Sequence, residues 1–169
     1  MLRETLLGIT EQFPAISLDF FLKSLTNPAF LSKVVPGSKV EFHNWEGNGC
    51  HLLWECPLKH PALKSRDYLL QMDSDLVLEI QPEDALSPYV WDFYMPKNSL
   101  FFALAGRLRA KMVGSNLKIG IYLTELQIKD PELQQIGLPF FIRWFRTNIR
   151  EMFKKFHAEA QNPTQLLSN

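Results

Sequence analysis

LPFFIRWFRTNIREMFKKFHAE, residues 138–159, is the stretch of sequence that decides the fold of this chain. Its large apolar residues recur at steps of three and four, so an α-helix carries them on one face, in a stripe roughly 120° wide. The stripe consists of Leu138, Phe141, Ile142, Phe145, Ile149, Met152, Phe153 and Phe156. Such an aromatic face has to be buried, and the strands predicted in the rest of the chain can cover it.

The opposite side of the same predicted helix is basic. One interpretation is a solvated face whose cations pair with the acidic central strands. The other is a surface that contacts anionic phospholipid headgroups or a partner. The contact residues would then be Arg143, Trp144, Arg146, Arg150 and Lys154. The helical angle of Trp144 also allows its ring to tuck against the sheet, and both placements stay open.

Composition places the chain among globular proteins of ordinary size. With 169 residues and 46% hydrophobic content, we expect a single domain over residues 1–160 and a flexible tail over 161–169. The formal net charge is zero, so we expect no nucleic-acid partner. Cys50 and Cys56 are too few for a disulfide framework, and no run of about eighteen apolar residues predicts a spanning helix. We therefore expect a cytoplasmic protein, or a membrane-peripheral one if the basic helix face meets lipid.

The N-terminal third contains helical signals after an ambiguous start. Residues 1–13 fit a short helix and a strand about equally badly, and both alternatives stay open. Ser17 is a predicted N-cap, and apolar residues follow it at helical spacing. Asn27-Pro28 ends that helix and starts a second one, which Pro36-Gly37 closes. The sequence therefore predicts two short helices over 17–35.

Six segments with strand-like patterns fill the middle of the chain. They span residues 39–45, 50–56, 66–80, 89–95, 100–113 and 117–128. Glycine-rich turns follow the first and the fifth segments, which indicates antiparallel hairpins. A break near Ser74 allows either two strands or one bulged strand.

The order of elements predicts an α+β fold. We expect a curved antiparallel β-sheet of about six to seven strands that grips the long C-terminal helix, with two short helices near the N-terminus. A strongly curved sheet and a straight helix do not mate everywhere, so space between them is expected.

The same order resembles the SRPBCC superfamily, which has the START-like helix-grip fold. The resemblance is carried by Leu25-Thr26-Asn27-Pro28-Ala29-Phe30-Leu31 and Val35-Pro36-Gly37, and by the closing pattern of two long strands and a long helix. In that superfamily, a stretch like 25–37 follows the first strand and leads into the second strand. The resemblance implies a deep apolar cavity between sheet and helix that holds lipids, sterols, polyketides or other hydrophobic ligands. Some members of the superfamily are enzymes.

The predicted cavity walls come from the two long strands and the last helix. Tyr68, Tyr122 and Arg107 are the polar side chains considered near it, and alternation directs Arg107 outward. The predicted ligand-binding residues are Tyr68, Leu104, Leu108, Met112, Ile119, Ile121, Tyr122, Phe141, Phe145 and Met152.

No catalytic or metal-binding motif emerges from the sequence. Cys50-His51 and Cys56-x-x-x-His60 match no common structural zinc spacing. Strand alternation places Glu41, His43 and Trp45 on one face, opposite Val40 and Phe42, and we interpret that face as surface. We therefore predict no catalytic residue, no metal and no cofactor.

Three functional hypotheses follow from these patterns. The leading one is a protein that binds or carries a hydrophobic small molecule in a helix-grip cavity. The second is a cyclase- or hydrolase-type enzyme on the same fold, which would need an inward-facing acid or base. The third is a peripheral membrane or protein-interaction module that uses the basic helix face. The oligomeric state stays open.

Overall fold

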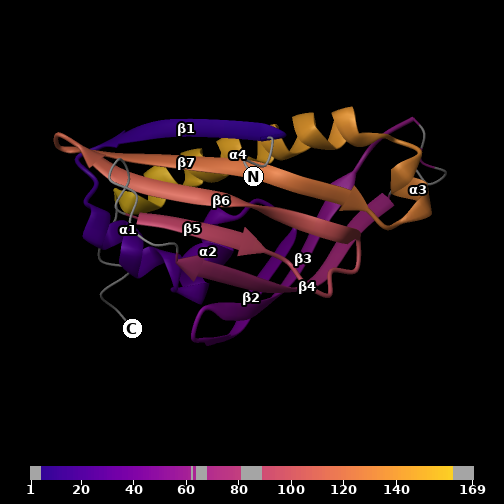
Figure 1. Ribbon diagram of the computed structural model, residues 1–169, viewed down its shortest axis with the longest axis horizontal. Coiled ribbons are helices and arrows are strands. Elements are labelled where there is room, and N and C mark those ends of the chain that lie inside the picture. Colours follow the sequence, from indigo (N-terminus) through magenta and orange to yellow (C-terminus); the bar gives the residue numbers. More distant parts are fainter. Residues whose placement is uncertain (1–4, 62, 64–67, 81–88, 162–169) are drawn as a thin grey trace.

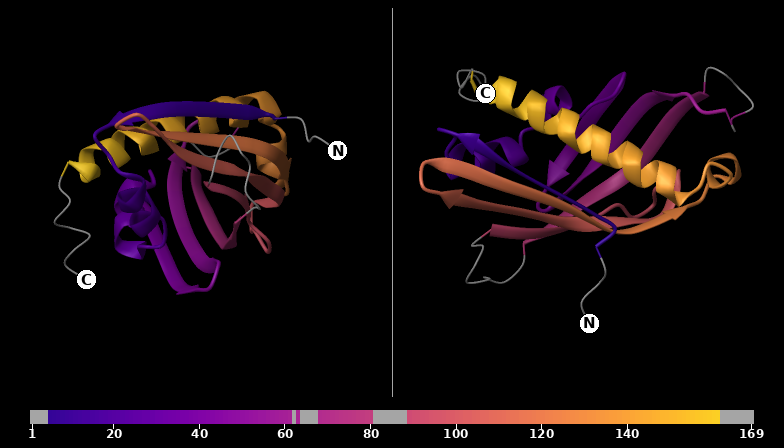
Figure 2. Two further views of the ribbon diagram at one scale, coloured as in Figure 1. Left: turned by 60° about the vertical axis from the view of Figure 1, so that its left-hand side comes forward. Right: turned by 90° about the horizontal axis from the view of Figure 1, so that it is seen from above.

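The computed structural model describes residues 5–61, 63, 68–80 and 89–161. A long helix lies across one face of a curved antiparallel sheet, and two short helices close one end (Figures 1 and 2). The elements are β1 Leu7–Pro14, α1 Leu18–Leu25, α2 Pro28–Val34, β2 Lys39–Glu46, β3 Gly49–Leu58, β4 Tyr68–Ile80, β5 Tyr89–Tyr94, β6 Phe101–Val113, β7 Asn116–Ile128, α3 Pro131–Gln134 and α4 Leu138–Ala160. This is the expected fold class, and the predicted tail over 161–169 lies outside the described residues except for Gln161.

The sheet has seven strands in the order β1-β7-β6-β5-β4-β3-β2, and every pair is antiparallel. Strands β2 to β7 follow one another as neighbours, whereas β1 pairs with β7, the last strand. α1 and α2 connect the two edge strands, β1 and β2. Figure 2 shows α4 crossing the face around which the sheet curves. We call this the inner face.

The described N-terminal residues form a strand, so the helical alternative over 7–13 is wrong. Leu7 lies opposite Leu123 and Phe13 opposite Leu117, and all four side chains are buried. Alternate residues of β1 thus join the core while β7 satisfies the backbone hydrogen bonds of β1. The apolar alternation is interrupted by polar residues at 10–12, which is why periodicity alone did not identify this edge strand.

The two short helices begin where the sequence predicts. Ser17 Oγ accepts a hydrogen bond from the backbone N–H of Phe20 at 3.1 Å, and Asn27 Oδ1 accepts one from that of Phe30 at 3.1 Å. These caps satisfy N–H groups that have no partner within the helix. Pro28 occupies the first turn of α2, where its missing N–H breaks no helical hydrogen bond.

A bulge in β2 overturns one expectation about side-chain direction. Asn44 has φ of 54°, and the register between β2 and β3 shifts between His43 and Glu46. A bulge adds one residue to a strand, so the side-chain alternation changes phase there. Trp45 consequently shares the inner side with Phe42, whereas Glu41 and His43 hydrogen-bond to each other on the outer face. The prediction that Trp45 faces outward with Glu41 and His43 is therefore wrong.

Clusters of aromatic side chains hold the last helix against the sheet at both of its ends, and we call these two clusters the seats of α4. Near its start, Phe141 is completely buried and packs edge-on against Phe101 of β6. Near its end, Phe156 packs edge-on against Phe13 of β1, with ring centroids 5.0 Å apart. The same ring contacts Phe20, Phe21 and Phe30 of the short helices. The helix is thus held at two points about 15 residues apart, which span roughly 22 Å along its axis.

Candidate functional site

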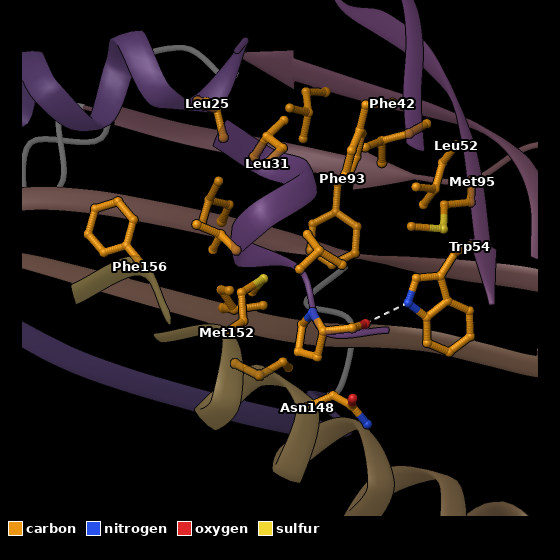
Figure 3. Close-up of a pocket in the computed structure, with 18 of the residues that line it drawn as sticks. Leu25, Leu31, Phe42, Leu52, Trp54, Phe93, Met95, Asn148, Met152 and Phe156 are labelled. Carbon is orange, nitrogen blue, oxygen red and sulfur yellow. Dashed lines mark hydrogen bonds between the residues drawn. The ribbon is translucent and has the colours of Figure 1, made fainter. Parts of the chain in front are cut away.

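A cavity of about 300 Å³ lies between α4, the inner face of the sheet and the two short helices. Figure 3 shows its lining: Leu25 and Leu31 from the short helices, Phe42 and Leu52 from β2 and β3, and Met152 from α4. Every element except β1 and α3 contributes to the wall among the described residues. The cavity therefore occupies the space that the curved sheet and the straight helix leave between the two seats of α4.

The lining is almost entirely apolar. Among the described residues, no acidic, basic, histidine or cysteine side chain belongs to the wall. The polar contributions are the hydroxyl of Ser24, the amide of Asn148 and the indole N–H groups of Trp45 and Trp54. This part of the wall supplies no carboxylate, imidazole, amine or thiol for catalysis.

Six of the ten predicted ligand-binding residues line this cavity. They are Leu104, Leu108, Ile119, Ile121, Phe145 and Met152. The strand residues among them alternate with outward-facing side chains, as the pattern of β6 and β7 indicates. Whether they contact a ligand stays a prediction.

The other four predicted residues do not line the cavity. Tyr68 lies at the start of β4, and its hydroxyl donates a hydrogen bond to Asp130 at 3.4 Å. Met112 lies near the β6–β7 turn and is 39% exposed. Phe141 belongs to the solid aromatic seat at the start of α4.

Tyr122 lies on the outer face of the sheet, because it alternates with the inward-facing Ile121 and Leu123. Its ring covers Gly8 and Gly120, where an added Cβ would come within 2.9 Å of the ring atoms. The guanidinium of Arg109 lies 5.5 Å from the ring centroid. Tyr122 is thus a structural residue of the β1–β7 region.

The sequence analysis missed the cavity's amide, Asn148. It lies four residues from both Trp144 and Met152, which line the same wall. Its Nδ2 donates a hydrogen bond to the backbone oxygen of Trp144 at 2.8 Å. Its Oδ1 accepts no hydrogen bond from any described residue. The signal for Asn148 was available in the sequence, because it is an amide at an apolar-stripe position of the helix.

The two tryptophans of the wall differ in how their indole N–H groups are satisfied. Trp54 Nε1 donates a hydrogen bond to the backbone oxygen of Pro36 at 2.7 Å, as Figure 3 shows. Trp45 Nε1 is buried and has no partner among the described residues. A buried donor without a partner costs about 1–3 kcal/mol of stability. The bulge at Asn44 therefore brings an unsatisfied donor to the wall of the cavity.

A surface depression of about 450 Å³ adjoins one end of the cavity. The two share Leu25, Trp45 and Leu78 in their walls. The depression is also lined by exposed residues of the β2–β3 turn and the end of β4, including Asn48 and Ile80. The shared residues therefore form the wall between the cavity and this surface depression.

The basic face of α4 carries exposed cations. Arg143, Arg146, Arg150 and Lys154 have no ion pair with any described residue. The expected pairing with acidic strand residues is absent from this part of the chain, because Asp73 and Asp75 lie on the outer face and α4 lies on the inner one. None of the described helices is long and apolar enough to cross a membrane.

Trp144 does not belong to that basic face. Its ring packs edge-on against Trp54 of β3, with centroids 5.6 Å apart, and the side chain lines the cavity. Of the two placements left open for Trp144, the ring therefore takes the one against the sheet, and its contact with a membrane or partner stays a prediction. Trp144 shares a helix face with Phe141 and Asn148, which lie three residues before it and four residues after it. This face is directed toward the sheet.

On the outer face, His51 lies between two carboxylates. Its Nε2 is 2.7 Å from Asp73 and its Nδ1 is 3.0 Å from Asp75. The hydrogen bond with Asp75 raises the pKa of His51 above its usual 6.5, and the charges of both aspartates act in the same direction. The pair of aspartates therefore stabilises the protonated imidazole.

The cysteines beside these residues are free thiols. Burial, helped by the charge of Asp75, raises the pKa of Cys50 to about 11, and burial also raises that of Cys56. Metal ligation and nucleophilic attack both use the thiolate, which these environments disfavour. No group of three or more metal-ligating side chains occurs in the described ranges.

Comparison with known proteins identifies the fold. A START superfamily protein from Mycobacterium smegmatis aligns with 92% of this chain and 96% of its own, at a TM-score of 0.63 and 9% identity. A conserved protein from Geobacillus kaustophilus aligns with 91% of this chain and 93% of its own, at 0.64 and 13%. The Zhui aromatase/cyclase from Streptomyces sp. R1128 covers 94% of both chains, at 0.58 and 13%.

These similarities confirm the START-like helix-grip fold over nearly the whole chain. No family model matches the sequence, and no curated protein does either. Identities of this size establish a shared architecture and leave the function to be argued from the site itself.

The two tryptophans provide a matched prediction. Trp45→Phe and Trp54→Phe each remove an indole N–H and part of a ring, but only Trp54 loses a hydrogen bond. We expect Trp54→Phe to lower the free energy of unfolding by about 1 kcal/mol more than Trp45→Phe. Urea denaturation of the ligand-free proteins measures this difference. Equal losses would show that Trp45 Nε1 has a partner in solution.

The outer histidine predicts a pH dependence of stability. Because the folded-state pKa of His51 is raised, its contribution is fully present below about pH 6.5 and is lost as pH rises through the folded pKa. We expect His51→Gln to destabilise the protein more at about pH 5.5 than at about pH 8.5. Urea denaturation at the two pH values measures this. The difference should vanish in an Asp73→Asn, Asp75→Asn background, and its persistence there would assign it to other groups.

Proposed function

We propose that this protein binds or carries a hydrophobic small molecule in the cavity between α4 and the sheet. The observation that carries the proposal is the apolar cavity of about 300 Å³ itself. Natural protein cores are packed to a density that leaves few voids larger than a water molecule. A cavity of this size lies at the lower end of the range of about 300–1,000 Å³ that small-molecule sites occupy.

The chemistry of the wall supports the same proposal. Transfer of apolar ligand surface from water into such a cavity is favourable by about 25 cal/mol per Å². An aromatase/cyclase is among the proteins of similar fold. Catalysis of that kind would need an acid or base at the wall, and the described lining contributes none. Binding without chemistry is therefore the better-supported function.

The adjoining depression provides a route for the ligand. Both spaces are lined by Leu25 of α1, Trp45 of β2 and Leu78 of β4. A ligand that enters there would pass between these apolar side chains. The exposed Ile80 extends this apolar surface outward.

Filling the cavity tests the proposal. We expect Met152→Trp to weaken binding of the fluorescent apolar probe N-phenyl-1-naphthylamine at least about tenfold, because the larger side chain occupies ligand space. Titration of the probe's fluorescence measures the affinity. Arg150→Trp, on the exposed side of the same helix, is the matched control and should leave affinity unchanged. Equal affinities for all three proteins would place the probe outside the cavity.

A second function is favoured by the unpaired cations of α4. Four exposed cationic side chains on one helix face can meet an anionic membrane surface, at about 1 kcal/mol per charge. A carrier that exchanges its ligand with a membrane would benefit from such contact. Because Trp144 faces the cavity, this contact would be electrostatic and superficial.

Vesicle sedimentation tests this second function. We expect the protein to sediment with phosphatidylcholine/phosphatidylserine vesicles at low salt and to stay in solution with phosphatidylcholine alone. Arg146→Glu with Arg150→Glu should abolish sedimentation. Lys97→Glu, an exposed charge change at the β5–β6 turn, is the control. Absence of sedimentation with the anionic vesicles would remove the membrane function and leave the cavity proposal intact.

A further inference from the structure

We propose that the cavity selects an uncharged ligand that carries a hydrogen-bond donor, an O–H or N–H group, and that this donor meets Oδ1 of Asn148. The inference rests on the proposed binding function and specifies the chemical class of the ligand. An apolar cavity by itself would accept any hydrophobic molecule of suitable size. The few polar atoms of the wall narrow that choice.

The wall excludes charged ligands through desolvation. No described residue of the wall carries a charge that could pair with a carboxylate, a phosphate or an ammonium group. Moving an unpaired ion from water into such a site costs several kcal/mol. The exposed cations of α4 do not compensate, because they lie on the side of the helix that faces away from the cavity. The ligand is therefore neutral where the cavity encloses it.

Asn148 has a fixed orientation and one unused acceptor. Its Nδ2 donates to the backbone oxygen of Trp144 at 2.8 Å, and exchanging the two ends of the amide would bring two oxygens together. The oxygen Oδ1 is consequently the atom left for a partner. It accepts no hydrogen bond from any described residue. The side chain comes from α4 and lies across the cavity from Phe42 and Leu52 in Figure 3.

The other polar side chains of the wall are poorer acceptors than Asn148. Ser24 is only 2% exposed, and its hydroxyl donates a 2.8 Å hydrogen bond to the backbone oxygen of Phe21 in α1, so little of its oxygen is accessible to a ligand. Trp54 and Trp45 present N–H donors, of which only that of Trp45 is unused. The amide oxygen of Asn148 on α4 is therefore the side-chain acceptor available to a ligand's O–H or N–H group, whereas the N–H of Trp45 is buried.

A purely structural role for Asn148 makes a different prediction. An asparagine that only back-bonds to its own helix adds nothing to ligand choice. Its replacement by an apolar residue would then change the affinities of all apolar ligands in parallel. Selection by Oδ1 instead changes the affinity of ligands with a donor relative to those without one. The two roles are distinguished by the ratio of the affinity for a ligand with a donor to that for a ligand without one. This ratio is compared between the wild-type protein and a variant that lacks the Asn148 amide.

The experiment uses two isomeric competitors, 1-dodecanol and methyl undecyl ether, which differ in whether the oxygen carries a hydrogen. Each displaces N-phenyl-1-naphthylamine from the wild-type protein and from Asn148→Leu. We expect the alcohol-to-ether ratio of affinities to fall about three- to tenfold in Asn148→Leu, which corresponds to one net hydrogen bond. Thr147→Val, which removes a back-bonding hydroxyl from the exposed side of the same helix, should keep the wild-type ratio. Thermal unfolding followed by circular dichroism verifies that both variants fold, and Asn148→Met repeats the test with another apolar side chain.

A second comparison tests the exclusion of charge. 1-Anilinonaphthalene-8-sulfonate has the skeleton of N-phenyl-1-naphthylamine with an added sulfonate. We expect the neutral probe to bind the wild-type protein at least about tenfold more tightly. Equal binding of the two probes, with both sensitive to Met152→Trp, would overturn the exclusion of charged ligands.

The outcomes separate this inference from the function on which it rests. An unchanged alcohol-to-ether ratio in Asn148→Leu and Asn148→Met would overturn the role of Asn148 while the cavity still binds. Failure of the neutral probe to bind wild-type protein, together with no displacement by either competitor, would overturn the binding function itself.

Discussion

The seating of α4 on the inner face of the sheet is the interaction on which the rest of the structure depends. Phe156 holds the C-terminal end through rings of β1, α1 and α2, and Phe141 holds the N-terminal end through Phe101 of β6. Aromatic side chains bury large areas and pack edge-on, so few residues are enough at each seat. Between the seats the sheet curves away from the straight helix, and the cavity occupies that gap.

The same geometry explains how the short helices take part. They connect the two edge strands of the sheet and supply Phe20, Phe21 and Phe30 to the seat of Phe156. Their Leu25 and Leu31 also contribute to the cavity wall. The chain segment that closes the core at the C-terminal end of α4 therefore also borders the space proposed for the ligand.

Much of this architecture was predictable because strong periodicity specifies it. The apolar stripe of α4, the caps at Ser17 and Asn27 and the alternation along β6 and β7 all have the predicted roles. Strand alternation and the helical stripe together also placed six of the ten predicted residues on the cavity wall. The start of the chain was harder, because the register of β1 is set by pairing with β7, a contact between distant segments that local periodicity does not contain.

The details that matter most for recognition were not predictable in this way. The direction of Trp45 depends on a single bulge at Asn44, which changes the phase of β2 after its first half. Trp144 lies at the border of the apolar stripe, so the helical pattern does not determine whether its ring faces the sheet. Its ring packs on Trp54, a residue 90 positions away in the sequence. Tyr122 and Met112 were misplaced for simpler reasons: one is on the outer face, and the other is near a turn. Asn148 was not predicted because the apolar periodicity that identifies the buried face of α4 does not register a polar residue within it.

The central claim is that the gap between the seats of α4 is a ligand site. Native mass spectrometry of the freshly purified protein, followed by organic extraction and analysis of the extract, tests it most directly. The account predicts a discrete added mass that denaturation releases and that belongs to a neutral molecule with a hydroxyl or N–H group. A protein with only its own mass that also takes up no neutral apolar compound added in excess would contradict the account.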